Sequence, residues 1–593
     1  LNNVYSYVRE VTDAIHPNTY GGIFTEASLD GANRWNKTYA EWTNGSFNSA
    51  SAQASEYFSK YYQAIAKAST FIQNVDKCTE AAASTRGKWK SEARALRAYY
   101  YFELLRLYGP IPLIGEDPIP LDASLEELIK ERNSVDECVN FIATELQSAI
   151  DSGDLLQRAG KANLGRMDVA TCMALKAKLY LYWASPLFNG NTDQASVKNK
   201  DGKQLFPQTE DNSKWTQARD AYERFMTFAT GQGYKLTEVY TNGKLDPYAS
   251  CRAAGEFFTT TWEAVDELIF VKLRDLYDYT YWVCPKFTDF QDTDVTGGGG
   301  YYTTQETVDL FFTKDGLTIE EDPGYDKFEG IPSANNFTSG RYYDPNNPSR
   351  LYFDADKSKV LKQWKDREPR FYVNITYSGS IWLNEGKYNE EMRTDFTNGT
   401  CGKSKASGDC PDSGYLIRRG AKASNNNGSK HFSPVLRLAD MYLGYAEALC
   451  MCSDLDNALT YLNKIRVRAG IPEYTFTATA GKITCPKTQT DLLNRIRRER
   501  LVELVFEWNR YFDVRRWKVA EGQNDPEHWI YPAYHTGGEG GKVYGMNMDK
   551  DYPAFFERTS FETRVAFTKK QYFMPIPYDD LRRIPSLVQN LGW

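Results

Sequence analysis

The sequence predicts a mainly α-helical protein in which paired helices form a scaffold and a long, loop-rich segment with short strands interrupts it. Three observations lead to this fold class. Apolar residues recur at helical spacing in 46–230 and again in 432–520. Residues 231–431 are instead rich in Gly, Pro, Asn and aromatic residues, which are typical of loops and short strands. Each helix of a pair has an apolar face that it cannot bury alone, which favours stacked helical hairpins.

Two long helices are expected between residues 46 and 108. The first has an apolar stripe formed by Tyr57, Tyr61, Ile65, Ala68 and Ile72. The second has one formed by Trp89, Ala93, Leu96, Tyr100, Leu104 and Leu107. It stops at Gly109-Pro110, since glycine and proline end helices.

Three further helices are expected before the loop-rich segment. The first runs from Val135 to Ile150 with Ser134 as N-cap, the second from Asp168 to Ala184, and the third from Trp215 to Phe228. Such pairs suggest stacked hairpins of the tetratricopeptide type, but the strict consensus of that repeat is missing, so the periodicity alone supports only a helical array. Within the loop-rich segment, the alternating run Phe371–Tyr377 predicts a strand.

Helices are expected to resume from Pro434 to Ala520. Within Ile496–Trp517, apolar residues at helical spacing line one face, and Glu499, Glu503 and Glu507 form a second stripe. Arginines lie three or four residues from these glutamates, a spacing that favours ion pairs along the helix. We expect all 593 residues to form one domain, with 521–593 as a closing segment.

Several segments of the C-terminal third resemble the SusD/RagB family of outer-membrane lipoproteins. The run 496–517 is similar to the family's R-R-E-R-x-x-E-L-x-F-E-x-x-R-x-F-D-x-x-R-W signature, and 437–448 to its R-L-A-E-x-Y-L-x-Y-A-E-A helix. Residues 462–472 look like its N-x-I-R-x-R-A-G-x-P element, and 574–577 with 585–593 look like its P-I-P … N-P-x-L-x-Q-N-x-G-W ending. The resemblance implies the SusD-like fold, with its tetratricopeptide-like core.

Bulk properties exclude some classes of protein. The net charge of −7 argues against nucleic-acid binding, which needs a concentrated cationic surface. No apolar run approaches the roughly 20 residues of a membrane-spanning helix. Residues 1–5 do not resemble a signal peptide, so the chain is either cytosolic or already processed. The resemblance implies the second: a surface-exposed outer-membrane protein with a lipid anchor on a cysteine upstream of residue 1.

No catalytic residue is expected. Glu503 and Glu507 lie one helical turn apart, as a glycosidase pair can, but nearby arginines lower rather than raise the pKa of an acid, which favours structural ion pairs. The acidic residues Asp289, Asp292 and Asp294 precede four glycines. They lack the spacing of an EF-hand, so a solvated loop is favoured over a calcium site.

No cofactor or metal is expected either. The four histidines form no recognisable nucleophile–base arrangement, and Gly297–Gly300 follows no phosphate-binding pattern, so a flexible loop is favoured there. The cysteines show no zinc-binding spacing. Cys401 and Cys410 bracket a polar loop, and either a disulfide between them or two isolated thiols fits the sequence.

Aromatic residues suggest a binding surface instead. The chain has 41 Tyr, 31 Phe and 13 Trp residues, and tyrosine and tryptophan rings stack well on sugars. The expected ligand contacts come from an N-terminal loop and from a patch around a glycine run: Asp30, Asn33, Arg34, Trp35, Trp42, Tyr281, Trp282, Tyr301 and Tyr302. The alternative is that Trp35 and Trp42 pack on the helices and that the tyrosine run is the face of a strand.

The resemblance implies a glycan-binding protein at the cell surface. Such a protein captures an oligo- or polysaccharide and delivers it to a SusC-type TonB-dependent transporter, over which it acts as a lid. A peptide-binding lid protein of RagB type is an alternative with the same partner. A glycan-cleaving enzyme and a plain tetratricopeptide scaffold are further alternatives.

Overall fold

The computed structural model describes the chain except residues 9–22, 36–39, 116–123, 125–129, 256–264, 276, 289–295, 384–390 and 422–429. For residues 23, 273–275, 277–278, 280 and 430–432 it describes the backbone but not the side chains. In the part of the chain that it describes, no helix is long and apolar enough to cross a membrane. The calcium alternative at Asp289, Asp292 and Asp294 lies outside the described residues.

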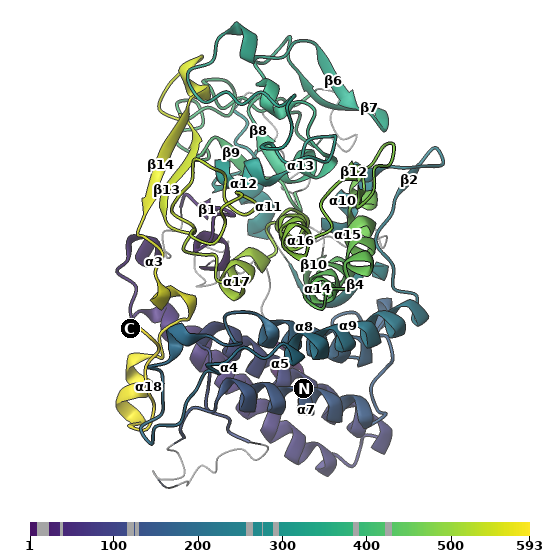
Figure 1. Ribbon diagram of the computed structural model, residues 1–593, viewed down its shortest axis with the longest axis vertical. Helices are drawn as coiled ribbons and strands as arrows, with labels where there is room; N and C mark the ends of the chain where they lie inside the picture. The colour runs from purple at the N-terminus through teal and green to yellow at the C-terminus, as the bar shows by residue number, and fades with distance from the viewer. Residues whose placement is uncertain are drawn as a thin grey trace.

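The N-terminal half forms a layer of antiparallel helices at the bottom of Figure 1. Its members are α4 (Ala52–Asn74), α5 (Ala83–Tyr108), α7 (Val135–Asp151), α8 (Val169–Ala184) and α9 (Ser213–Gly231). Each helix packs on the next in sequence, from α4 to α9. All five residues of the predicted stripe on α4 are buried. Ser134 and Glu137 form a capping box at the start of α7, which confirms the expected N-cap.

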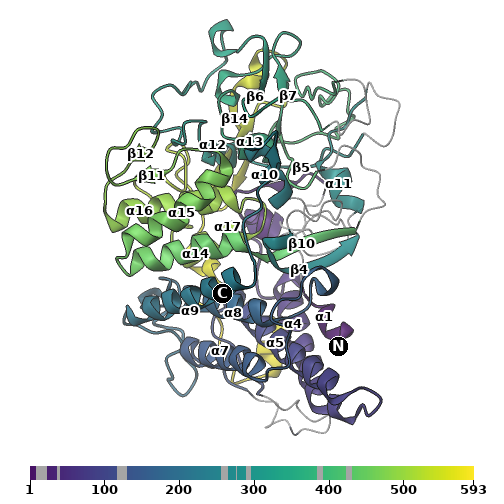
Figure 2. The same cartoon turned by 90° about the vertical axis from the view of Figure 1, so that its right-hand side faces the viewer.

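A second set of helices extends this layer. These are α14 (Leu438–Met451), α15 (Leu455–Ala469), α16 (Gln489–Glu503) and α17 (Asn509–Arg516). Helix α14 packs on α15 and α16 and also on α8 and α9, so the two helical stretches form one continuous scaffold (Figure 2). Gly444 permits the approach to α9, because a Cβ there would lie 2.2 Å from the Tyr222 hydroxyl oxygen. The mainly α fold class, with a scaffold of paired helices, is thus confirmed.

The run from Ile496 to Trp517 is not one continuous helix. It breaks between α16 and α17, where Phe506 and Trp508 adopt positive φ angles of 62° and 64°. The break places Glu503 and Glu507 on the same arginine, Arg437, which binds both carboxylates at 2.8 Å. Tertiary ion pairing therefore overrides the helical periodicity of this segment.

The prediction that the glutamates of the stripe pair with arginines of the same helix is also wrong. Glu503 pairs with Arg370, Arg437 and Arg468, which belong to other elements. The arginines of the segment in turn contact distant groups, and Arg498 donates hydrogen bonds to the carbonyls of Asp309 and Leu310 at 2.8 and 2.7 Å. These buried contacts hold the loop-rich segment on the helical scaffold.

The loop-rich segment lies above the helices in Figure 1. A small four-stranded sheet in the order β1-β5-β9-β8 organises its centre. The strands are β1 (Ala32–Asn33), β5 (Tyr301–Tyr302), β8 (Ile375–Tyr377) and β9 (Tyr415–Ile417). Because β1 lies near the N-terminus, this sheet joins residues about 270 positions apart and so fixes the N-terminal loop beside the insertion.

Two-stranded sheets and short helices complete the described part of the insertion. The strands are β2 (Tyr240–Thr241), β3 (Lys244–Leu245), β4 (Leu268–Asp275), β6 (Arg341–Asp344), β7 (Asn347–Asp354) and β10 (Lys430–Arg437). The helices are α10 (Pro247–Gly255), α11 (Tyr277–Val283), α12 (Gln305–Leu310) and α13 (Pro369–Asn374). Strand β10 pairs with β4, so 434–437 is strand and not the expected start of a helix.

The predicted strand at 371–377 is half wrong. Its first four residues belong to α13, and only Ile375–Tyr377 form a strand, β8. Pro369 occupies the first turn of α13, which is a favoured position for proline in a helix. All seven residues are buried, so no polar face distinguishes strand from helix in the sequence.

Further short elements lie towards the two ends of the chain. Short elements at the N-terminus are α1 (Asn2–Tyr5), α2 (Ile23–Glu26) and α3 (Ala40–Asn44). Towards the C-terminus follow β11 (Tyr474–Thr475), β12 (Ile483–Thr484), β13 (Gly541–Met546), β14 (Arg558–Arg564) and α18 (Tyr578–Arg583). The Trp593 ring lies 6.2 Å from that of Trp42, so the last residue covers the N-terminal region.

Candidate functional site

Strand pairing brings the two predicted binding segments together. Ala32 and Asn33 pair with Tyr302 and Tyr301 in an antiparallel register. Gly31 allows this approach, because a Cβ there would lie 2.2 Å from the Tyr302 carbonyl oxygen. The chain leaves β1 at Arg34 and Trp35, which therefore lie beside the residues that precede β5.

An aromatic platform formed by Trp35, Tyr281 and Trp282 lies at this junction. The Trp35 side chain is 45% exposed, and its ring centroid lies 6.3 Å from that of Trp282 at an interplanar angle of 43°. Tyr281 and Trp282 come from α11, are half-buried and contact each other edge to face at 5.2 Å. Aromatic faces held on neighbouring elements suit the apolar C–H face of a sugar ring.

The glycine run 297–300 supports the platform from behind. A Cβ on Gly300 would lie 2.6 Å from the Trp35 ring, and one on Gly298 would lie 2.6 Å from the Tyr281 ring. Their amides donate to Trp282 and Tyr281 carbonyls at 3.1 and 2.8 Å. The run is thus hydrogen-bonded to the C-terminal end of α11, which differs from the expected flexible loop. Its amides are used within the protein, which does not favour a phosphate cradle.

Polar groups surround the platform. The Arg34 guanidinium lies 5.6 Å from the Trp35 ring centroid and forms an ion pair with Asp412. Lys286 forms a second ion pair with Asp409 at 3.2 Å. Partly exposed charged groups beside aromatic rings can accept hydrogen bonds from hydroxyl groups and donate hydrogen bonds to them. The surface thus combines apolar rings with polar groups, which suits a carbohydrate.

The other predicted ligand residues are in the core. Trp42 is only 4% exposed and packs on Phe47 and Trp593 at 4.9 and 6.2 Å. Tyr301 and Tyr302 form strand β5 within the sheet, and both are buried. These three rings are buried in this structure, as expected for side chains that pack in the core.

Asp30 and Asn33 are buried as well and have structural roles. Burial raises the pKa of the Asp30 carboxyl to about 7, although the charge of Arg510 opposes the shift. The Asn33 side chain accepts a hydrogen bond from the Trp35 amide at 2.9 Å and so helps to fix the turn that presents the platform. Neither side chain offers a ligand an accessible surface in this structure.

The glutamate pair is a structural ion-pair network. Burial alone raises the pKa of the Glu503 carboxyl, but the charges of Arg468, Arg437 and Arg370 outweigh it and hold that pKa below its ordinary value of 4.5. A general acid needs a raised pKa. The geometry therefore supports the structural interpretation of Glu503.

Cysteines and metal ligands give no second candidate. Cys401 and Cys410 are both buried, and no disulfide joins the two in the part of the chain that the structure describes. Within the described ranges, no group of three or more His, Cys, Asp or Glu side chains is arranged to hold a metal ion.

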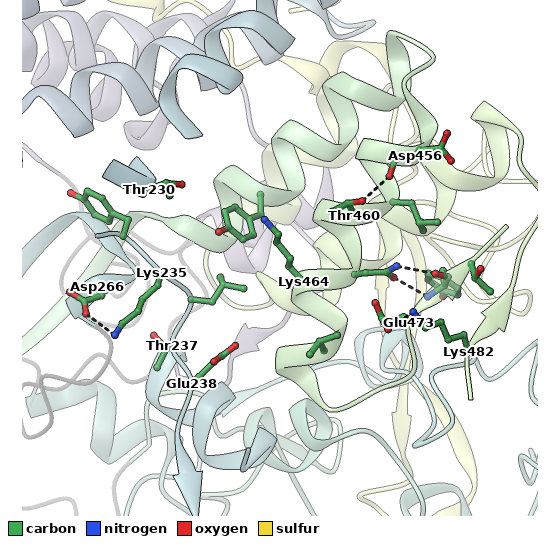
Figure 3. Close-up of a pocket in the computed structure, with 18 of the residues that line it drawn as sticks. Thr230, Lys235, Thr237, Glu238, Asp266, Asp456, Thr460, Lys464, Glu473 and Lys482 are labelled. Carbon is green, nitrogen blue, oxygen red and sulfur yellow. Dashed lines mark hydrogen bonds and ion pairs between the residues drawn. The ribbon is translucent and has the colours of Figure 1, made fainter. Parts of the chain in front are cut away.

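Two cavities away from the platform were not anticipated from the sequence. One of about 1090 Å³ is an open groove between residues 230–240 and α15 (Figure 3). Two ion pairs lie on its walls, Lys235 with Asp266 at 3.5 Å and Lys482 with Glu473 at 2.7 Å. The other, of about 600 Å³, lies within the insertion and includes Tyr343 and Arg418. In the sequence, the aromatic residues of 341–345 gave a hint of this second cavity.

Family models match most of the chain. The model described as "SusD family" matches residues 267–593, and one described as "Starch-binding associating with outer membrane" matches residues 1–181. A SusD-like protein of Bacteroides ovatus is 23% identical over 584 residues, which cover 94% of this chain and 85% of the relative.

Solved structures agree with the fold. A SusD-like protein from Bacteroides fragilis superposes with a TM-score of 0.71 at 21% identity, covering 100% of this chain and 96% of that one. Surface glycan-binding protein A from Bacteroides uniformis gives a TM-score of 0.54 at 16% identity, covering 99% of each chain. A protein described as a laminarin-binding SusD-like protein gives 0.51 at 18% identity, covering 100% of this chain and 99% of that one.

Proposed function

Because the chain belongs to the SusD family, we propose that it binds an oligo- or polysaccharide through the aromatic platform of Trp35, Tyr281 and Trp282. The observation that carries the proposal is the pair of tryptophan rings 6.3 Å apart, one of them 45% exposed, beside two ion pairs. The starch-binding description of one matching family model and the names of two structural neighbours support the same ligand class.

Binding is proposed to occur without catalysis. The carboxylates considered as a glycosidase pair, Glu503 and Glu507, are both paired with Arg437 in the core at 2.8 Å. In this proposal, the protein captures a glycan at the outer membrane and delivers it to a SusC-like TonB-dependent transporter. A lipid anchor upstream of residue 1 attaches it to the membrane. The family resemblance supports the transporter partner and the anchor.

Titration of platform variants with neutral glycans tests the proposal. Trp35→Ala and Trp282→Ala are each compared with the parent by isothermal titration calorimetry on laminarin and starch oligosaccharides. An aromatic contact contributes about 0.5–1.5 kcal/mol, so each variant should bind about two- to twelvefold more weakly. Tyr578→Ala is the matched control, because Tyr578 is 54% exposed on α18 and does not belong to the platform.

The result that would overturn the proposal is full affinity in both tryptophan variants. Release of new reducing ends by the parent protein would contradict binding without catalysis. Co-purification of the full-length lipoprotein with a SusC-like transporter from outer membranes tests the partner.

A further inference from the structure

The 600 Å³ cavity in the insertion, here called the Arg418 cavity, is separate from the aromatic platform. It is lined by residues of α10, of the β6–β7 hairpin and of the segment 372–383, and by Glu391 and Arg418; Trp35, Tyr281 and Trp282 are not among the described residues that line it. The β6–β7 hairpin projects at the upper right of Figure 1. The volume of the cavity falls within the roughly 300–1,000 Å³ range of small-molecule sites.

Arg418 supplies an unbalanced positive charge to this cavity. Its side chain is only 9% exposed, and its Nε is buried with no hydrogen-bond acceptor. No carboxylate among the described residues forms an ion pair with it; its guanidinium instead lies 5.6 Å from the Trp382 ring. Burial lowers the pKa of Arg418 below its ordinary value. An unpaired buried charge is costly, so a site of this kind attracts an anion.

Two of the other arginines on the wall, Arg350 and Arg341, differ in this respect. Arg350 binds Asp246 at 2.9 Å and also Asp344. Arg341 pairs with Glu391 and lies 3.6 Å from Asp354. Their charges are balanced within the protein, which leaves that of Arg418 for a ligand.

Tyrosine rings form much of the remaining wall. Tyr352 and Tyr372 are stacked with centroids 3.9 Å apart and an interplanar angle of 9°. Tyr343 is 38% exposed at the rim, and the Tyr377 hydroxyl is buried without a hydrogen-bond partner. Ring surfaces beside an unpaired guanidinium suit a ligand that has both an apolar ring face and an anionic group.

We propose that the Arg418 cavity is a second carbohydrate site that takes an acidic sugar residue, a uronate or a sulfated hexose. The anionic group binds the Arg418 guanidinium, which can donate two parallel hydrogen bonds to a carboxylate or sulfate. The sugar ring packs against Tyr343 at the rim. This inference rests on the proposed glycan binding and adds the class of glycan, one with charged residues.

Arg418→Met tests this assignment. Methionine keeps much of the side-chain volume over Trp382 but removes the charge. We titrate parent and variant with an oligogalacturonate, a chondroitin sulfate oligosaccharide and a neutral laminarin oligosaccharide. At least one acidic probe should lose about tenfold or more in affinity, while the neutral probe is unaffected. The carboxylate and sulfate probes distinguish the two sources of charge.

Two further variants separate a binding role from a structural one. Arg418→Lys keeps the charge but not the paired donors, so it should recover part of the affinity for the acidic probe. Because no described residue accepts a hydrogen bond from the Arg418 side chain, Arg418→Met should unfold at the same temperature as the parent or higher. Trp282→Ala should weaken neutral binding and leave the acidic probe bound.

Several outcomes overturn the inference. If Arg418→Met binds both acidic probes with the same affinity as the parent, the Arg418 cavity is not an acidic-sugar site. The same follows if the parent binds the neutral oligosaccharide but neither acidic probe. If the parent binds an acidic peptide in a way that depends on Arg418 but binds no acidic sugar, the ligand of this cavity is a peptide and the inference is wrong. If the parent binds neither neutral nor acidic glycans, the proposed function itself fails.

Discussion

Replacement of Glu503 by glutamine gives a quantitative test of the buried ion-pair network. Glu503 is buried between the end of α16 and three arginines, and its two oxygens lie 2.8 Å from Arg437 and 3.2 Å from Arg370. Glutamine has nearly the same shape but no charge. The variant therefore leaves the arginines with one balancing carboxylate fewer in a dry environment.

The expected loss of stability follows from the burial of this network. Removal of one partner from a buried ion pair costs about 3–5 kcal/mol. For 593 residues at about 2.1 cal/mol/K each, the unfolding entropy is about 1.2 kcal/mol/K. The melting temperature should accordingly fall by about 2–4 °C.

Scanning calorimetry at neutral pH measures this shift. Glu210→Gln, at an exposed glutamate in the loop before α9, is the matched control and should leave the melting temperature unchanged. An unchanged melting temperature in Glu503→Gln would refute the reasoning. Loss of a glycan-cleaving activity in that variant would show instead that Glu503 is catalytic.

The pH dependence has a defined sign. The folded-state pKa of Glu503 lies below its ordinary value of 4.5, so the stabilisation is fully present above that value. It is lost as the pH falls towards the folded-state pKa. The difference in melting temperature between the parent and Glu503→Gln should therefore shrink below about pH 4.5.

Two other substitutions test the platform and its support. In Gly300→Ala, the added Cβ displaces the Trp35 ring, so glycan affinity in calorimetry should fall severalfold, whereas Gly231→Ala, at a glycine with open space around it, should bind like the parent. Burial raises the pKa of Asp30 from 3.8 to about 7, so its carboxylate destabilises the fold increasingly as the pH rises through that interval. The melting temperature of Asp30→Asn relative to that of the parent should therefore increase as the pH rises over that range. A difference between the two melting temperatures that does not vary with pH would contradict this.

Helix positions were predictable because their signals are local. The stripe from Tyr57 to Ile72 lies on the buried face of α4, and Ser134 caps α7 as its sequence indicates. Helical periodicity and capping depend on residues three or four positions apart, which the sequence displays directly. The same locality misleads at 504–508, where a break serves contacts with Arg437 that no local pattern reveals.

The candidate site was only partly predictable for a related reason. Trp35 and Trp42 occur in similar polar surroundings in the sequence, yet one is exposed and the other is covered by Trp593. Tyr281 and Trp282 meet Trp35 because β1 pairs with β5. The Arg418 cavity was missed because an unpaired arginine is recognisable only when the partners of its neighbours are known.

The sequence by itself determined the family, the helical hairpins and the aromatic composition that favours sugar binding. Only the tertiary structure decided which aromatic rings reach the surface and which charges remain unpaired. The physical reason is that burial and ion pairing are properties of contacts between residues far apart in the chain. A side chain's chemistry is written in the sequence, but its accessibility depends on what folds over it.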